Sequence, residues 1–412
     1  MNYDTLLQEA VSYQEQILSH RHYLHTHAET GFDLHDTLTY VSAQLKDMGC
    51  EPIPCGKAGL VTLIGGKQPG KVFLLRADMD ALPVREASGE PFACPNGRMH
   101  ACGHDMHTAM LLGAARLLKD HEDQIPGTVK LMFQPAEEIF AGSSDMIDHG
   151  VLKDPAVDAA MMIHVMSGVP FAEGSITISP AGISAPAADV FEIQIQGKGC
   201  HGSSPNTGID PLNVAAHILI ALQTLHAREL AMTDRAALTI GSLHAGEAPN
   251  VIPDTAVMGG SLRTFDEDLR AYLKQRLMDI AQATAAMFRA QATVTFTSGC
   301  PTLHNDPTLC QDAKRYLTAL LGKTQVMSAE ELAAMAAASA PGKRNSSVAG
   351  SEDFAYVSQK VPTVMLSLAA GHPDHGHRYP LHHPQVTFCD DVLPIGSAVH
   401  TCMAMRWLEE HR

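Results

Sequence analysis

The sequence predicts an α/β protein, in which a larger domain built on a mostly parallel sheet carries a smaller, inserted α+β domain. Three observations favour this architecture. Short apolar runs rich in β-branched residues alternate with helix-like segments, this pattern changes between about residues 185 and 301, and Pro, Gly and Ser are frequent at both borders of that region. With 412 residues, the chain is long enough for two domains that each bury an apolar core.

The larger domain is expected to begin with two helices and to continue with alternating strands and helices. Gly31 and Gly49 are expected to end the first two helices, which span Asp4–His27 and Asp36–Met48. Short apolar runs predict strands over Val72–Asp78, Thr128–Gln134, Ala159–Val165 and Val361–Leu368. Further helices are expected over Met106–Lys119 and, on the surface, over the Ala-rich segment Ala329–Ala340.

The inserted domain has a different order of elements, typical of a ferredoxin-like α+β sandwich. Its expected strands are Val190–Gln196, Ala237–Leu243, Thr255–Arg263 and Ala292–Thr297, and its expected helices are Pro211–Leu230 and Glu267–Phe288. We therefore expect a discontinuous larger domain, residues 1–185 and 300–412, and an inserted domain, residues 186–299.

Composition argues against several classes of protein. The formal net charge is −16 at pH 7 and no run of basic residues occurs, which argues against a surface for nucleic acid or anionic membranes. No stretch approaches the roughly 18 apolar residues of a membrane span, and the N-terminus lacks the apolar run of a signal peptide. The nine cysteines are scattered and form no CxxC pair. These features favour a cytoplasmic protein that acts on a small molecule.

Candidate metal ligands are concentrated in the sequence MHACGHDMHT, residues 99–108. Cys102 and His104 stand two positions apart in a Gly-containing turn, and Asp105 and His107 follow closely. Thiolate and imidazole groups at this spacing are typical ligands of zinc or a similar divalent ion. The segment therefore predicts a metal centre.

Two adjacent carboxylates, Glu137 and Glu138, follow the expected strand Thr128–Gln134 in the sequence QPAEE. Because neighbouring side chains cannot point the same way, one carboxylate can bind a cation while the other faces water. In metal-assisted hydrolysis an ion lowers the pKa of water, and a carboxylate removes the proton. The pair predicts such a division of roles.

Further candidate ligands also follow apolar strands. Asp78 and Asp80 end one expected strand and His164 ends another, and sites in parallel sheets form beyond the carboxyl ends of the strands. One more histidine is expected to complete the site. There are five candidates for this histidine, at positions 372, 375, 377, 382 and 383, and their spacing in the sequence does not decide between them.

These motifs resemble those of the dinuclear-metal peptidase family that contains aminoacylases and glutamate carboxypeptidases, and in particular its amidohydrolase branch of hippurate hydrolases and auxin-conjugate hydrolases. The resemblance covers nearly the whole chain. It is carried loosely by residues 21–33, and closely by LRADMDALPV (75–84), MHACGHDMHT (99–108), FQPAEE (133–138), IHV (163–165), GKGCHGSSP (197–205), APNVIPD (248–254), GSEDFA (350–355) and LHHP (381–384).

The resemblance implies two divalent metal ions per subunit, which could be Zn, Mn, Co or Ni. Cys102 would bridge the two ions, and the remaining ligands would be His104, Glu138, His164 and His382. Glu137 would act as the general base, and Asp80 would orient a ligand histidine.

For the inserted domain, the resemblance implies a lid that also pairs two subunits in a homodimer. His201 would stabilise the oxyanion in the partner's site, while Asn250 and Arg263 would hold the carboxylate of the substrate. The family's usual glycine before this histidine is Cys200 here.

The reaction implied is hydrolysis of the amide bond of N-acyl amino acids. A dipeptidase or carboxypeptidase of the same family is an alternative that no residue excludes, and a non-catalytic metal-binding protein is a more distant one. No GxGxxG follows a strand and no GxSxG occurs, which argues against a nicotinamide oxidoreductase and a serine hydrolase. The acyl group, the amino acid and the native metal stay open.

Overall fold

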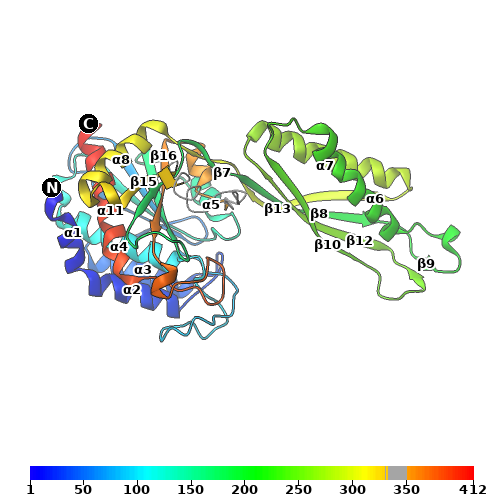
Figure 1. Ribbon diagram of the computed structural model, residues 1–412, viewed down its shortest axis with the longest axis horizontal. Coiled ribbons are helices and arrows are strands. Elements are labelled where there is room, and N and C mark those ends of the chain that lie inside the picture. Colours follow the sequence, from blue (N-terminus) through cyan, green and yellow to red (C-terminus); the bar gives the residue numbers. More distant parts are fainter. Residues whose placement is uncertain (330, 333–349) are drawn as a thin grey trace. The chain divides into compact units, whose positions relative to one another are not determined.

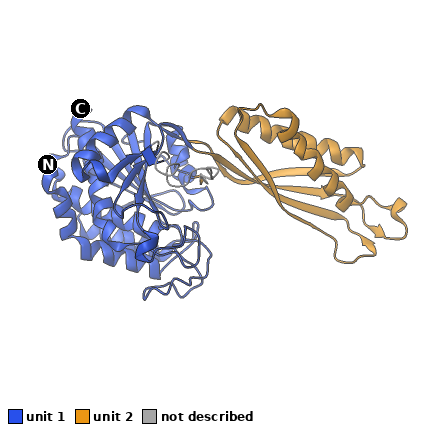
Figure 2. Ribbon diagram, viewed as in Figure 1, with its two compact units in different colours: residues 1–184, 304–348, 352–412 blue, residues 185–303, 349–351 orange. Residues whose placement is uncertain are grey.

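The computed structural model describes residues 1–329, 331–332 and 350–412 (Figure 1). The chain forms two compact units (Figure 2). Apart from undescribed positions, unit 1 comprises Met1–Ser184, His304–Val348 and Glu352–Arg412, and unit 2 comprises Ala185–Leu303 and Ala349–Ser351. The chain returns from unit 2 to unit 1 after Leu303, a few residues beyond the expected border at 299/300, because the last long strand of unit 2 runs to Cys300.

Within the described residues, unit 1 contains an eight-stranded sheet in the order β1-β2-β4-β3-β5-β16-β6-β15. The neighbouring strands β4, β3, β5 and β16 are parallel, whereas the pairs β2–β4 and β16–β6 are antiparallel. The mostly parallel sheet predicted from the sequence is thus confirmed. The strands are β1 (Ile53–Cys55), β2 (Gly59–Gly65), β3 (Val72–Asp78), β4 (Thr128–Gln134), β5 (Ala159–Met166), β6 (Ile176–Ile178), β15 (Val326–Ser328) and β16 (Thr363–Ala369).

Helices α4 and α11 pack against the central strands and against each other, and α1 and α2 pack on these two helices (Figure 1). The apolar side chains between these layers form the core of unit 1. The helices of the unit are α1 (Tyr3–Ser12), α2 (Gln14–Thr26), α3 (His35–Asp47), α4 (His104–Asp120), α5 (Gly142–Asp148), α8 (Pro307–Leu321), α10 (Ala355–Ser358) and α11 (Leu393–Glu410).

Unit 2 contains an antiparallel sheet in the order β10-β12-β8-β13, with α6 and α7 packed on it. Apolar residues that alternate along the strands form a separate core with these helices. The α+β class expected for the insertion is thus confirmed. The elements are β8 (Ala187–Gln196), β9 (Cys200–His201), α6 (Pro211–Thr224), β10 (Ala236–Ala245), β11 (Val251–Ile252), β12 (Thr255–Thr264), α7 (Glu267–Met287) and β13 (Gln291–Cys300).

The structure corrects several expected elements. The single helix expected over Asp4–His27 is divided at Tyr13, where Ser12 Oγ donates a hydrogen bond to the carbonyl of Glu9 (2.6 Å), a contact that bends helices. A single helix is expected over Pro211–Leu230. The α-helix ends at Thr224, and a π-helical turn over Leu225–Glu229 follows it. Most of the helix expected over Ala329–Ala340 lies outside the described residues.

Helix α11 has no counterpart in the sequence-based prediction, although it is one of the longest helices of unit 1. It is buried on nearly all sides, so its apolar residues follow no helical period. None of the helices in the described parts of the chain is long and apolar enough to cross a membrane.

A buried charged network joins α2 to the start of α4. His25 Nδ1 contacts Asp105 Oδ2 (2.8 Å), His25 Nε2 contacts Glu86 Oε1 (3.1 Å), and Arg21 Nε donates to Asp105 Oδ2 (3.2 Å). Burial alone would lower the pKa of His25, and Arg21 acts in the same direction, but the two carboxylates outweigh both and raise that pKa to about 9. His25 is therefore a cation within this network at neutral pH.

We expect this cation to make the stability of unit 1 depend on pH. Because the pKa rises from its ordinary value of 6.5 to about 9 on folding, the stabilisation is complete below pH 6.5 and is lost as the pH rises through 9. The shift corresponds to about 3 kcal/mol. Between pH 6.5 and a pH of about 9.5, the thermal unfolding midpoint, measured in chelator, should fall further for the wild type than for His25→Gln.

His20→Gln is the matched control, since His20 is also buried in α2. Burial lowers the pKa of His20 to about 4, so this side chain stays neutral across the same range. The control should retain the pH dependence of the wild type. A wild-type dependence equal to that of His25→Gln would contradict the role of His25.

Candidate metal centre

The candidate centre lies where three neighbouring parallel strands end. The strand order places β3 between β4 and β5, and Asp78 at the end of β3 is paired with Gln134 at the end of β4. His164 is the third-last residue of β5. The carboxyl ends of these strands meet at one edge of the sheet, so the segments that follow them lie close together.

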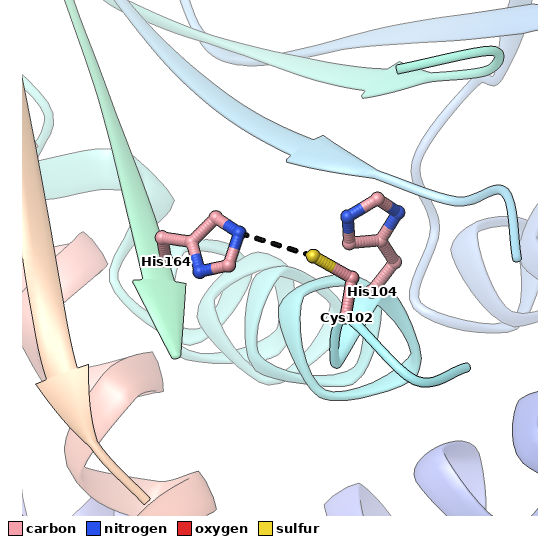
Figure 3. Close-up of side chains that lie close together, drawn as sticks. All are labelled: Cys102, His104 and His164. Carbon is pink, nitrogen blue, oxygen red and sulfur yellow. Dashed lines mark hydrogen bonds between the residues drawn. The ribbon is translucent and has the colours of Figure 1, made fainter. Parts of the chain in front are cut away.

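A tight turn before α4 brings Cys102 and His104 to this edge. Gly103 between them has a φ of 87°, and a Cβ at this position would lie 2.3 Å from the side chain of Val165. Only glycine satisfies both the backbone angle and the lack of space. Figure 3 shows the result: His164, on its strand, faces Cys102 on the turn, with His104 alongside. His164 Nε2 lies 3.5 Å from Cys102 Sγ.

Hydrogen bonds orient both of these histidines. His104 Nδ1 donates to the main-chain carbonyl of Asp80 (2.7 Å), and His164 Nδ1 donates to the carbonyl of Val165 (2.7 Å). With the proton on Nδ1, each Nε2 keeps a free lone pair. An imidazole held in this way by an outer acceptor is typical of metal-binding histidines.

His382 and Glu138 reach the same thiol from other segments. His382 Nε2 lies 3.2 Å from Cys102 Sγ and 3.6 Å from Glu138 Oε1. The backbone of His382 has a φ of 66°, a conformation that non-glycine residues adopt mainly where the surroundings impose it, as at functional sites. Its own N–H donates to the carbonyl of Ala101 (2.9 Å), which ties this loop to the turn before α4.

The loop after β4 is held by Asp80. The two oxygens of its carboxylate accept hydrogen bonds from the main-chain N–H groups of Glu137 (2.9 Å) and Glu138 (3.2 Å). Ala136, at the start of this loop, has a φ of 55° and is strained in the same sense as His382. Asp80 therefore contacts His104 mainly through its main-chain carbonyl, while its carboxylate positions the pair of glutamates.

The donor set fits divalent metal. The ligand atoms form two groups that share the thiol, one of Cys102, His104 and His164 and the other of Cys102, Glu138 and His382, with atoms within 4.8 Å of one another in each group. His104 Nε2 and Glu138 Oε1 are buried and have no hydrogen-bond partner. Buried polar atoms without partners are rare and call for one, and a cation would supply it.

The candidate centre contains several carboxylates close together, and their negative charges raise the pKa values of Glu137 and Glu138. Burial raises the pKa of Glu137 well above its ordinary range, and the negative charges of Glu352 and Glu138 add to this effect. The pKa of Glu138 is raised to about 7, mainly by burial. The charge of His104 lowers this pKa, and the charges of Asp80 and Asp78 raise it. A carboxylate with a raised pKa is a suitable proton acceptor near neutral pH.

His107 and His383, which the sequence left open as ligands, do not join these groups. His107 Nδ1 donates to Asp78 Oδ1 (2.6 Å), and His107 Nε2 accepts the N–H of Val165 (2.8 Å), so neither nitrogen is free. His383 instead stacks on Tyr379, with a ring separation of 4.3 Å.

The remaining expected site residues belong to unit 2. His201 in β9 is paired with Val251 in β11, and the N–H of Gly202 donates to the carbonyl of Asn250 (2.8 Å). His201 Nδ1 accepts a hydrogen bond from the N–H of Ser203 (3.1 Å), so the proton of a neutral ring is on Nε2. His201 is exposed, and it therefore presents a hydrogen-bond donor to the outside of unit 2.

Arg263 lies at the opposite end of β12 from this group. The strand spans Thr255–Thr264, and Asn250 precedes its first residue, whereas Arg263 is the next to last. At about 3.3 Å per residue, eight residues of strand separate Thr255 from Arg263 by roughly 26 Å. One subunit therefore cannot hold a single substrate carboxylate with both Asn250 and Arg263.

The chain is similar to proteins of one known family. The model of the family described as Peptidase family M20/M25/M40 matches residues 74–406. The chain belongs to this family. It is 37% identical to an N-acetyl-L-cysteine deacetylase of Bacillus subtilis over 92% of this chain and 85% of the relative. It is 36% identical to an IAA-amino acid hydrolase of Arabidopsis thaliana over 95% of this chain and 84% of that protein.

Among solved structures, the chain resembles a dinuclear metal binding peptidase of the M20 family from Bacillus subtilis. The TM-score is 0.76 and the identity 31%, and the match covers 97% of this chain and 99% of the other. The family resemblance inferred from the sequence motifs is thus confirmed. This M20 chain is a metal-dependent amidohydrolase, and the candidate centre brings together residues that could hold divalent metal.

The sequence analysis did not predict the buried network of ion pairs that Arg76 forms near the candidate centre. Arg76 in β3 is fully buried and contacts Asp78 Oδ2 (2.6 Å), Glu352 Oε1 (2.8 Å) and Asp353 Oδ1 (3.1 Å). Gln134 Nε2 also donates to Asp353 Oδ1 (2.7 Å). The network links β3 and β4 to the GSEDFA motif. Arginine within an otherwise apolar strand was the signal in the sequence, because such a charge must be paired.

Proposed function

We propose that this chain hydrolyses the amide bond of N-acyl amino acids at a centre of two divalent metal ions. The observation that carries the proposal is the pair of donor groups that share Cys102, next to the carboxylate of Glu137, whose Oε2 lies 3.9 Å from His104 Nε2. A shared thiolate between two sets of ligands suits two neighbouring ions better than one. The names of the deacetylase and the IAA-amino acid hydrolase support N-acyl amino acids as the class of substrate.

In this proposal the ions are held by Cys102, His104, Glu138, His164 and His382. Divalent ions bound there supply Lewis acidity, which lowers the pKa of water and polarises a carbonyl group. Glu137, buried and with its pKa raised, takes the proton from the attacking water and passes it to the leaving nitrogen. Asp80 keeps Glu137 and Glu138 in place through its two hydrogen bonds to their N–H groups.

Residues of unit 2 complete the proposed site from a second subunit. His201 donates from Nε2 to the oxyanion that forms on the amide carbonyl. Asn250 and Arg263, at opposite ends of β12, would contact the substrate carboxylate from different subunits of a homodimer. The exposed edge strand β10 and the exposed residues Val190 and Leu243 support an interface within residues 186–299. The molar mass in solution, measured by light scattering, tests the dimer.

A matched set of substrates tests the activity. An N-acetyl amino acid and the glycyl dipeptide of the same amino acid differ mainly in the free amino group. We expect the metal-reconstituted protein to hydrolyse the N-acyl compound with the higher kcat/KM, and to lose this activity when the substrate carboxylate is converted to an amide. A preference for the unblocked dipeptide would favour the dipeptidase alternative instead.

Removal of metal should abolish hydrolysis, because we assign no nucleophile other than water. Added Zn, Mn, Co or Ni should restore it. In the same samples, Cys102 should react with an alkylating reagent only after chelation, as peptide mapping can show. Turnover by protein proven free of metal would refute the proposed mechanism.

A further inference from the structure

A further group of side chains that could hold a metal ion lies in unit 1 and shares no residue with the centre described above. We propose that Glu173, His377 and Cys389 bind a further divalent ion of the zinc type. A carboxylate oxygen, an imidazole nitrogen and the sulfur of these residues lie within 4.8 Å of one another, although Glu173 is far from the other two in the sequence. Carboxylate, imidazole and thiolate together are typical ligands of zinc.

The hydrogen bonds of His377 leave one nitrogen directed at this group. His377 Nδ1 contacts Thr387 Oγ1 (2.9 Å), and His377 Nε2 lies 3.8 Å from Glu173 Oε1. The threonine hydroxyl can accept a hydrogen bond from Nδ1, and in that tautomer Nε2 carries the lone pair. In that tautomer, His377 has the arrangement of an outer acceptor and a free Nε2 that His104 and His164 show.

The other ligands are preorganised as well. Glu173 accepts a hydrogen bond from the N–H of His372 (3.0 Å) and contacts His375 Nδ1 (2.9 Å). The N–H of Cys389 donates to the carbonyl of Ala370 (2.7 Å), and Cys389 forms no disulfide. The side chains of Glu173 and His377 are only 18% and 19% exposed. A half-buried site with three ligands leaves its fourth position for water or for His375.

An ion at this site would join three separate segments of unit 1. Glu173 lies between β5 and β6, His377 follows β16, and Cys389 precedes α11. His377 and Cys389 bracket the loop that carries His382, one of the proposed catalytic ligands. The role of such an ion is therefore structural: it would close this loop and restrict the position of His382.

Metal content measures the proposal directly. After equilibration with Zn²⁺ and removal of excess metal, Cys389→Ser and His377→Gln should each contain one ion per subunit fewer than the wild type. His383→Gln is the matched control, because His383 lies in the same loop and stacks on Tyr379 without reaching the group. It should keep the wild-type content. Equal metal content in the wild type and both ligand variants would overturn the proposal.

A second measurement separates this site from the catalytic centre and from loss of folding. In wild-type protein, Zn²⁺ should slow the alkylation of Cys389, followed by peptide mapping, and should leave Cys200 in unit 2 unaffected. The protection of Cys389 should persist in Cys102→Ser and disappear in His377→Gln. If Zn²⁺ protects Cys389 equally in His377→Gln and in the wild type, the protection does not come from the proposed site.

Discussion

Glu137→Gln should lower kcat for an N-acyl amino acid by at least about a hundredfold, the usual effect of removing a general base, while the bound metal is retained. The amide has nearly the shape of the carboxylate but cannot accept the proton of water. Burial and the neighbouring negative charges raise the pKa of Glu137. Because the proposal places Glu137 outside the ligand set, the substitution removes the proton acceptor without removing a ligand. Steady-state kinetics and metal analysis of the same preparation measure both effects.

Glu138→Gln should have the opposite signature and serves as the matched comparison. Glu138 Oε1 is buried without a hydrogen-bond partner and lies 3.6 Å from His382 Nε2 and 3.9 Å from His104 Nε2. Loss of its charge should therefore release metal from the centre, and activity should fall together with metal content. Equal loss of metal in the two variants would show that the roles are assigned wrongly.

His201→Ala should lower kcat by about 10²–10³-fold with unchanged metal content, the usual cost of removing one donor to an oxyanion. The hydrogen bond from Ser203 to Nδ1 leaves Nε2–H as the donor, which suits this role. His217→Ala is the matched control, because His217 is also an exposed histidine of unit 2 but packs on Phe288. A similar loss in His217→Ala would point to a structural cause.

Mixed dimers test whether His201 acts on the partner subunit. In equal mixtures of His201→Ala and Glu137→Ala subunits, half of the dimers are mixed, and each mixed dimer contains one site with both residues intact. Random exchange should therefore restore roughly a quarter of the sites. If the two inactive variants stay inactive after proven exchange, His201 does not act across the dimer.

The reciprocal mixture is the control. Wild-type subunits exchanged with a His201→Ala/Glu137→Ala double variant should retain activity in roughly a quarter of all sites if His201 acts in trans, but in about half if it acts within its own subunit. If His201 acts in trans, exchange raises the activity of the first mixture and lowers that of the second. Incomplete exchange would weaken both changes, so the two mixtures together separate trans action from incomplete exchange.

The sequence alone predicted the α/β class, the inserted α+β unit and the family, because these depend on local patterns. Apolar runs such as Val72–Asp78 and Thr128–Gln134 correspond to β3 and β4 residue for residue. The spacing of Cys102 and His104 singled out a metal centre, since a short turn holds both side chains on one side. Helix α11 was missed because a helix buried on nearly all sides carries no amphipathic period.

Only the tertiary structure decided which of the many polar residues can act together. Five histidines lie between β16 and α11, yet of these only His382 reaches Cys102, while His377 lies close to Glu173 and Cys389. His107 has the spacing of a ligand but uses both nitrogens in hydrogen bonds. Such outcomes depend on contacts between segments that are distant in the sequence and on which lone pair stays free. They also depend on strained backbone such as that of His382. A local pattern of residues predicts none of these.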